Sequence, residues 1–150
     1  MHNDKKFMNL ALSQANLAKE MGEVPVGAVI TLNNQFVSSG YNQTINNNDP
    51  TAHAEIIAIR EACINIDNHR LKDCHLYVTL EPCAMCFGAI VQARIKKVIF
   101  GAYDRKSGVC GSCFDLASTR CFNHSLELKH GILQRECSEI LSNFFQARRN

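Results

Sequence analysis

Apolar positions along the chain follow first a helical and then a strand-like spacing. In residues 4–20, apolar side chains recur three or four positions apart with charged residues between them, which predicts an amphipathic helix that ends near Gly22. Shorter apolar runs rich in β-branched residues predict strands. The further predicted elements are a strand at 24–32, a two-residue turn at Asn33-Asn34, a strand at 35–41, a helix at 54–64, a strand at 76–80, a helix at 83–93, strands at 97–101 and 125–129, and a C-terminal helix at 132–148.

The order of these elements indicates the fold class. Helices alternate with strands after an initial hairpin, which is typical of an α/β protein with helices on both faces of its sheet. We therefore expect a three-layer α/β/α sandwich with a mixed, largely parallel five-stranded sheet and the antiparallel hairpin at one end. The 150 residues match one ordinary domain, and neither a repeat nor an interdomain linker is visible, so we expect a single domain over 1–150.

Composition narrows the cellular setting. Hydrophobic residues make up 46% and charged residues 20% of the chain, as in ordinary globular proteins. No apolar signal segment is visible, and no run approaches the roughly 20 apolar residues that cross a bilayer. The eight cysteines are therefore expected to be free thiols in the cytoplasm, with no membrane partner. The net charge of +2 is small, so nucleic-acid binding would have to use local basic patches.

Two short motifs carry the candidate chemistry. Cys83 and Cys86 are three positions apart at a predicted helix start, which places both thiols on one face and near the positive end of the helix dipole. His53, at the start of another predicted helix, can supply a third ligand. Three protein ligands leave the fourth position of a tetrahedral zinc ion open for water, which is the arrangement of catalytic rather than structural zinc sites.

Glu55 lies two positions after His53 and is not needed as a ligand. Convergence of these two side chains requires a helix entry, because positions two apart in a helix interior point to nearly opposite sides. A neutral histidine and two thiolates already balance the charge of the zinc ion, so its water is acidified less than under three histidines, and a nearby general base would help. Glu55 is therefore predicted to take a proton from the water and pass it to the substrate.

A structural zinc site is the alternative interpretation of the same ligands. It would need a fourth protein ligand elsewhere in the chain. The candidates are Cys63, Cys74, Cys110, Cys113, Cys121, Cys137 and His69. The second Cys-x-x-Cys pair, Cys110 and Cys113, contains Gly111 and has no histidine nearby, so we interpret it as a loop with incidental thiols.

The His-x-Glu motif followed by Pro-Cys-x-x-Cys is the signature of zinc-dependent nucleobase deaminases. Longer segments resemble bacterial tRNA-specific adenosine deaminases, and the resemblance covers nearly the whole chain. These segments are Glu23 to Val29, Asp49 to Glu55, Tyr77 to Cys83, and Phe144-Phe145 followed by Arg148-Arg149. The resemblance implies a cytidine deaminase-like fold, a homodimer with one zinc ion per subunit, and a tRNA anticodon stem-loop as the partner.

The same resemblance implies the reaction and the roles of the motif residues. Proteins of this family hydrolyse the wobble adenosine of an anticodon to inosine. Carried onto this sequence, His53, Cys83 and Cys86 hold zinc, and Glu55 protonates the ring nitrogen and then the leaving amino group. Water attacks C6 of the adenine, and ammonia is released. The expected protein is therefore a zinc-dependent hydrolase that takes part in tRNA processing.

Substrate contacts are expected from several parts of the chain. Asn42, at the end of the second strand, resembles the asparagine that hydrogen-bonds the target base in this superfamily. Asp104 follows the strand at 97–101, and we hypothesise that it accepts from a ribose hydroxyl and so favours RNA. Phe144 is expected to pack in the core, while the residues after it bind RNA. The expected contacts are Asn42, Val26, Ala54, Pro82, Asp104, Phe145, Arg148 and Arg149, of which Val26 and Pro82 resemble apolar pocket walls.

Two other functions stay open at the level of the sequence. The signature also serves deaminases of free bases or nucleosides such as cytosine, cytidine or guanine, and the motif alone does not choose among these substrates. A non-enzymatic zinc module that binds RNA through the basic C-terminal helix would share the ligands too. Glu55 discriminates against this module, because a binding protein has no use for a proton shuttle.

Overall fold

The computed structural model describes residues 2–119 and 121–149. The helices and strands in these residues follow the predicted order. Their bounds are α1 His2–Glu20, β1 Gly27–Leu32, β2 Gln35–Tyr41, α2 Ala54–Ile66, β3 Cys74–Leu80, α3 Ala84–Gln92, β4 Lys97–Ala102, the short 3-10 helix η1 Leu116–Ser118, β5 Glu127–His130 and α4 Gln134–Arg149. None of the helices within the described residues combines the length and the apolarity that a membrane crossing requires.

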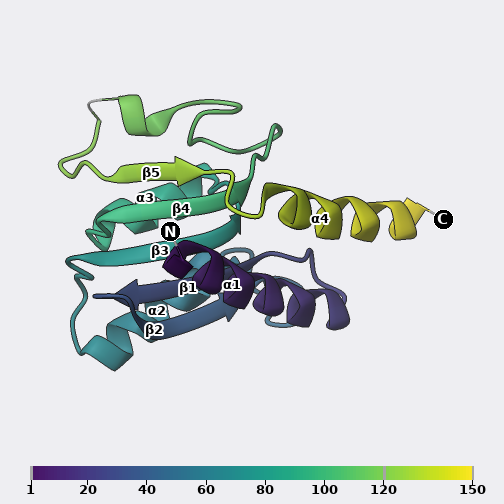
Figure 1. The fold of residues 1–150 in the computed structure, drawn as a ribbon, viewed down its shortest axis with the longest axis horizontal. Coiled ribbons are helices and arrows are strands. Elements are labelled where there is room, and N and C mark those ends of the chain that lie inside the picture. Colours follow the sequence, from purple (N-terminus) through teal and green to yellow (C-terminus); the bar gives the residue numbers. More distant parts are fainter. Residues whose placement is uncertain (1, 120, 150) are drawn as a thin grey trace.

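The five strands form one mixed sheet in the order β2-β1-β3-β4-β5. β1 pairs antiparallel with β2 and with β3, whereas β3, β4 and β5 pair in parallel. Four strands therefore run in one direction, and β1 runs against them. α1 and α4 cover one face of the sheet, and α2 and α3 cover the other (Figure 1). The predicted α/β/α sandwich with a mixed sheet and a hairpin at one end is confirmed.

Side chains that alternate along the strands separate two hydrophobic layers, because successive residues of a strand point to opposite faces. In β3, Leu76 and Val78 pack toward α2 and α3, whereas Tyr77 between them packs toward α1. β4 repeats the pattern, with Phe100 in the first layer and Ile99 in the second. The central strands are therefore buried on both faces, as the three-layer architecture requires.

The hairpin at one end of the sheet turns through Asn33 and Asn34. Both residues have positive φ values, 51° and 60°, which match a two-residue turn of type I′ and the asparagines that such turns prefer. The predicted turn is thus confirmed. The first strand starts at Gly27 rather than at the predicted Val24. Pro25 explains the difference, since it has no N–H to donate to a neighbouring strand.

The C-terminal elements also shift by a few residues. The last strand spans Glu127–His130 rather than 125–129. The C-terminal helix starts at Gln134, two residues later than predicted. Gly131 and Leu133 have φ values of 90° and 54°, which a right-handed helix excludes, so the helix begins only after them.

Close packing of α2 on β2 fixes where α2 begins. Gly40 lies beneath the first turns of the helix, and a Cβ at this position would stand 2.6 Å from the Ala54 carbonyl oxygen and 2.8 Å from the Ala58 nitrogen. Ser38, two residues before it in β2, donates a hydrogen bond of 2.7 Å to the Ala58 carbonyl oxygen. A larger residue than glycine would push the start of α2, and His53 before it, away from the sheet.

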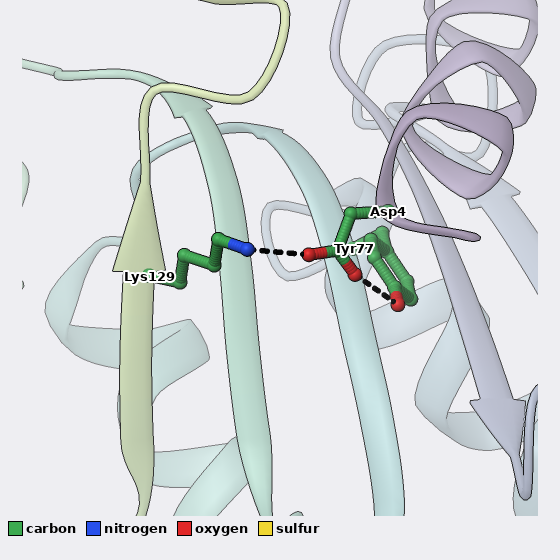
Figure 2. Close-up of polar contacts among 3 residues, drawn as sticks. All are labelled: Asp4, Tyr77 and Lys129. Atoms are coloured by element: carbon green, nitrogen blue, oxygen red, sulfur yellow. Dashed lines mark hydrogen bonds and ion pairs between the residues drawn. The ribbon is translucent and has the colours of Figure 1, made fainter. Parts of the chain in front are cut away.

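A polar contact joins α1 to the sheet (Figure 2). Tyr77 Oη donates to Asp4 Oδ1 at 2.8 Å, and Lys129 Nζ donates to Asp4 Oδ2 at 2.7 Å. The Asp4 side chain is only 14% exposed. Partial burial alone would raise the pKa of Asp4, but the hydrogen bonds from Lys129 and Tyr77 outweigh it and lower the pKa. The contact therefore ties the short edge strand β5 to the helix that covers the sheet.

Asp4→Asn is expected to lower the free energy of unfolding by about 1 kcal/mol at neutral pH, because Lys129 loses its charged partner. Folding lowers the pKa of Asp4, so the stabilisation is present above the ordinary value of 3.8 and is lost as the pH falls through the lower folded-state value. Thermal unfolding of wild type and variant should therefore show a gap in Tm at neutral pH that narrows in acid. Glu61→Gln, which changes an exposed side chain of α2, is the control. An equal loss in the control, or a gap that persists in acid, would contradict this role of Asp4.

Candidate active site

The helices α2 and α3 begin next to each other, beyond the end of β3. His53 is the N-cap residue of α2, with φ −72° and ψ 156°, and Cys83 is the N-cap residue of α3, with φ −82° and ψ 176°. Both backbones are extended, so each side chain can turn back toward the first turn of its helix. Glu55 and Cys86 lie in those first turns. The structure thus places both motifs at helix entries, as the sequence analysis requires.

The three expected zinc ligands converge. His53 Nδ1 lies 3.6 Å from Cys83 Sγ and 3.5 Å from Cys86 Sγ. All three ligand atoms lie within 4.8 Å of one another, and no fourth Cys, His, Asp or Glu joins their group in the described part of the chain. Zinc bonds of about 2.3 Å to sulfur and about 2.0 Å to nitrogen in a tetrahedron put the two atoms about 3.5 Å apart. The set therefore fits zinc with one position left open, which argues against a structural site.

The two thiols differ in their tendency to ionise. A hydrogen bond from Cys86, together with one from His53, lowers the pKa of Cys83 to about 4 although burial opposes it. Cys86 donates the hydrogen bond to Cys83, and this donation and burial both raise the pKa of Cys86. The hydrogen bond with Cys83 also raises the pKa of His53, against the effect of burial. The pair thus favours a thiolate at neutral pH, and a thiolate is the form of cysteine that binds zinc.

Glu55 stands beside the ligands without joining their group. Only 4% of its surface is exposed. Burial raises its pKa to about 7, and the hydrogen bond from its own backbone nitrogen and the nearby positive charge of His53 offset only part of this effect. A carboxyl group that titrates near neutrality can both take up and release a proton, which is the property expected of a proton shuttle.

A cavity of about 260 Å3 opens beside Glu55. Four of the expected substrate contacts line it, namely Val26, Asn42, Ala54 and Asp104. Pro82 is buried and does not line the cavity. Its carbonyl oxygen instead accepts a hydrogen bond of 3.0 Å from the Val109 nitrogen, so this residue supports the site from behind.

Asn42 has an unusual place in this cavity. Its Oδ1 is a buried side-chain atom without a hydrogen-bond partner, and no other such atom occurs among residues 2–119 and 121–149. Buried polar atoms are almost always paired, because an unpaired one costs about 1–3 kcal/mol. An N–H or O–H group of a bound molecule would satisfy Oδ1, so the amide is placed for recognition of a polar ligand.

Glu81 is a functional residue that sequence analysis missed. Its side chain is buried and accepts hydrogen bonds from the backbone nitrogens of Asp104 at 3.0 Å, Cys110 at 2.7 Å and Ser112 at 3.2 Å, and from the Ser112 hydroxyl. A Cβ at Gly108 would collide with this carboxyl group. Glu81 therefore folds the loop 104–112 against one side of the cavity. The sequence did contain one signal for this role, namely an acidic residue directly after an apolar strand.

Glu23 anchors the loop that contains residues 44–46 in the same way, and sequence analysis missed this residue as well. It is fully buried and accepts hydrogen bonds from the backbone nitrogens of Ile45 at 3.2 Å and Asn46 at 2.7 Å, with further bonds from the side chains of Thr44 and Asn46. Burial alone would raise the pKa of Glu23, but the bonds from Asn46 and Ile45 outweigh it and lower the pKa. The loop that carries Thr44, a residue of the cavity wall, is thus anchored.

Asp104 lines the cavity, but its carboxylate is engaged in its own turn. Oδ1 accepts from the backbone nitrogens of Lys106 at 3.1 Å and Ser107 at 3.3 Å, and Oδ2 accepts from the Ser107 hydroxyl at 2.9 Å. A carboxylate has about four acceptor sites, so little capacity is left for a further donor. The hypothesis that Asp104 accepts from a ribose hydroxyl stays a prediction.

The three expected contacts in α4 lie outside this cavity. Phe145, Arg148 and Arg149 line a neighbouring groove of about 490 Å3, which also includes Lys106 from the loop that Glu81 anchors. Arg148 Nη2 donates 2.6 Å to the Gly22 carbonyl oxygen, and its guanidinium lies 4.7 Å from the centre of the Phe144 ring. Arg148 therefore has a structural role in addition to any contact with a ligand.

The second Cys-x-x-Cys pair forms no metal group with other residues in the described ranges. Cys110 is buried and Cys113 is exposed. The backbone nitrogen of Cys110 is one of the donors to Glu81, so this position matters through its main chain rather than its thiol.

Comparison with known proteins gives the family. Residues 1–102 match the family model of the cytidine and deoxycytidylate deaminase zinc-binding region. The tRNA-specific adenosine deaminase of Haemophilus influenzae is 50% identical over 147 residues, which are 97% of this chain and 85% of the relative. The chain belongs to the tRNA-specific adenosine deaminase family. The predicted resemblance is confirmed, and zinc is the metal of this deaminase domain.

Solved structures of related proteins share the fold of this chain. One structure, from studies of A-to-I editing by tRNA:A34 deaminases at the wobble position of transfer RNA, is 43% identical with a TM-score of 0.88, and the match covers 91% of this chain and 99% of that one. The guanine deaminase of Nitrosomonas europaea has a TM-score of 0.77 at 19% identity, covering 93% of this chain and 83% of its own, and so shares the fold alone. Membership of the family therefore rests on the sequence relatives and the family model, which the first of these structures supports, and not on the fold alone.

Glu81→Ala is expected to lower the free energy of unfolding by about 3 kcal/mol, because three backbone N–H groups lose a charged acceptor. Amide hydrogen exchange should accelerate mainly in residues 104–112. Chemical denaturation and exchange mass spectrometry measure the two effects. Glu61→Ala, at an exposed position of α2, is the matched control and should change neither. Unchanged exchange in the loop of the Glu81 variant would show that the carboxylate does not hold it.

Proposed function

We propose that this protein is a zinc-dependent hydrolase that converts adenosine to inosine at the wobble position of a tRNA anticodon. The observation that carries the proposal is the convergence of His53, Cys83 and Cys86 beside a buried Glu55 whose pKa is about 7. This arrangement supports hydrolytic chemistry at neutral pH. The relatives supply the substrate class, since tRNA-specific adenosine deaminases match nearly the whole chain.

The proposed reaction uses one proton shuttle. A zinc ion held by the histidine and the two thiolates supplies the Lewis acid that makes water reactive at neutral pH. Glu55 takes a proton from the attacking water and delivers it to the ring nitrogen of the adenine as the bond from oxygen to C6 forms. Glu55 then carries the second proton to the amino group, the bond from C6 to that nitrogen breaks, and ammonia leaves.

Recognition of the base is assigned to the walls of the cavity. Asn42 offers an unsatisfied amide oxygen to an N–H or O–H of the flipped-out nucleotide. Val26 and Ala54 present apolar surface to the base, and Pro82 supports the wall without lining it. Asp104 stands at the cavity edge, where the ribose of the same nucleotide would lie.

Recognition of the rest of the anticodon stem-loop is assigned to the groove along α4. Phe145 is 47% exposed and can stack with a base, and Arg149 and Lys106 can contact phosphates. Arg148 contributes its charge from the position set by Gly22 and Phe144. The groove and the cavity share the loop 104–107, so one RNA strand can pass from one to the other.

A homodimer with one zinc ion per subunit completes the proposal. The outward face of α3 supports it: Met85 is 37% exposed, and the position of a Cβ at Gly88 has no atom within 4 Å. Such a small, apolar helix face is suited to close packing against another subunit. We also infer that residues 1–150 form one deaminase domain and that the protein acts in the cytoplasm, where tRNA is processed.

A deaminase of a free base or nucleoside is the alternative that the chemistry alone allows. The chain shares only the fold with the guanine deaminase, and no observation in the cavity favours a free base. A non-enzymatic zinc module is disfavoured by Glu55, because burial of a carboxyl group with a pKa raised to about 7 beside the ligands has a cost that proton transfer explains.

Incubation of the purified protein with an unmodified tRNA that carries a wobble adenosine is expected to produce inosine at that position, detected by sequencing. Glu55→Gln should lower the rate by at least about 100-fold, because the proton shuttle is lost, while the zinc content stays at one ion per chain. Cys86→Ala should lose zinc and activity together. Full activity in Glu55→Gln, or faster turnover of free adenosine, cytidine or guanine than of tRNA, would refute the proposal.

Phe145→Ala and Arg149→Ala are each expected to weaken tRNA binding by about 5-fold or more, through loss of base stacking in one case and of a phosphate contact in the other. Zinc content and the saturating reaction rate should not change. Fluorescence anisotropy with labelled tRNA measures the affinity. Asn143→Ala, an exposed residue of the same helix outside the groove, is the control. Equal affinities in all four proteins would remove α4 from the RNA interface.

A further inference from the structure

A second cavity lies at the end of the sheet opposite the candidate active site. It has a volume of about 400 Å3 and is lined by Arg70, Lys72, Asp73, Arg94, Lys96, His124 and Ser125. These residues precede β3, β4 and β5, whereas the zinc ligands lie beyond the other end of β3. This second cavity is termed the basic cavity.

The basic cavity concentrates positive charge. It holds two arginines and two lysines against one carboxylate, in a chain whose net charge is only +2. Neither of the two ion pairs recorded within the described residues includes any of these four cations. Several like charges around a concave surface focus a positive potential and attract anions.

Backbone contacts fix the two segments that carry these cations. The Leu71 nitrogen donates 2.6 Å to the Ala93 carbonyl oxygen, and the Lys96 nitrogen donates 3.0 Å to the Cys74 carbonyl oxygen. Residues 70–72 and 94–96 are therefore held side by side. The backbone that carries the cations is thus hydrogen-bonded at both segments.

One of the four cations, Arg94, stands at an unusual backbone position. Arg94 has a φ of 62°, a left-handed conformation that suits glycine or asparagine better than arginine. Arg94 Nη1 donates 2.7 Å to the Val91 carbonyl oxygen, which leaves its other donors available. Arg94 is thus held at the end of α3 by one nitrogen of its guanidinium, and the rest of the group can face the basic cavity.

The distance between the basic cavity and the active-site cavity limits the kind of ligand that could bind in both. β3 spans the seven residues Cys74–Leu80, which at about 3.3 Å per residue separates the cavities by roughly 20 Å. A nucleotide held at Asn42 cannot reach that far, so a ligand common to both cavities must be a polymer. RNA is the polyanion that the proposed activity brings to this protein.

We propose that the basic cavity binds backbone phosphates of the substrate RNA at a distance from the target base. The proposal rests on the proposed function, because it takes tRNA as the ligand. Arginine and lysine bind phosphate through charge-assisted hydrogen bonds, and such contacts add affinity without reading sequence. The basic cavity thus anchors the RNA, while the active site selects and converts the base.

The test is the double charge reversal Arg70→Glu with Lys72→Glu, both at exposed positions. The Kd for tRNA should rise about 10-fold or more near 0.15 M salt, and the slope of log Kd against log salt should fall by about 1.5, which corresponds to two phosphate contacts. Single-turnover inosine formation at saturating enzyme should stay within about twofold of wild type, because chemistry at the zinc site is untouched. The neutral pair Arg70→Gln with Lys72→Gln should show a smaller loss in the same direction.

Lys5→Glu with Arg135→Glu is the matched control. It reverses the charge of one lysine and one arginine at exposed positions on the face of the sheet that α1 and α4 cover. The change in net charge equals that of the Arg70 and Lys72 variant. Its Kd should change far less.

An unchanged Kd and slope in the Arg70 and Lys72 variant would overturn the proposal and leave an acidic protein as the partner of this surface. An equal loss in the control, or a lost saturating rate with an unchanged Kd, would also overturn it. If wild type binds tRNA but forms no inosine, the proposed function fails instead.

Discussion

The meeting of two helix N-termini beyond one end of the sheet is the constraint on which the site depends. His53 and Cys83 are the N-cap residues of α2 and α3, and the first turns that follow supply Glu55 and Cys86. Helix N-termini favour negative charge, so thiolates are stabilised where zinc is to be held. The position of α2 is set by its close approach to Gly40 in β2, and α3 follows β3 after only three residues. The packing of the backbone thus brings the ligands together.

Three buried carboxyl groups around one cavity show how hydrogen bonding decides the role of a charge. Glu23 and Glu81 each accept several hydrogen bonds from a loop, so each is kept as a structural anchor. Glu55 has no comparable set of donors, and burial raises its pKa to about 7. A buried carboxyl group with few donors favours its protonated form. The same residue type therefore fixes the walls of the cavity in two places and, in the proposed mechanism, moves protons in the third.

The sequence predicted those features that depend on residues close together along the chain. The ligand pair Cys83 and Cys86 and the helix entries were of this kind, and the bounds of the strand at 35–41 were predicted without error. Glu81 was missed because its donors lie 23 to 31 positions away, in a loop whose path the sequence does not reveal. Asp104 was hypothesised to accept from a ribose hydroxyl, and the sequence did not reveal that its own turn donates three hydrogen bonds to the same carboxylate. Local chemistry was therefore predictable, while loop conformation was not.

Selection of the substrate depends on surfaces that the catalytic motif does not include. The cavity of about 260 Å3 is far too small for an anticodon stem-loop, so the rest of an RNA must be read outside it. Phe144 is buried and Phe145 exposed, because neighbouring positions on a helix face different directions. Arg148 is tied to Gly22 and to the ring of Phe144, which fixes the end of α4 beside the end of α1. The helix is thus held by one face, and the opposite face is left at a fixed distance from the cavity. In the proposed complex, a rigid mount of this kind would let the zinc chemistry act on one nucleotide of a large RNA.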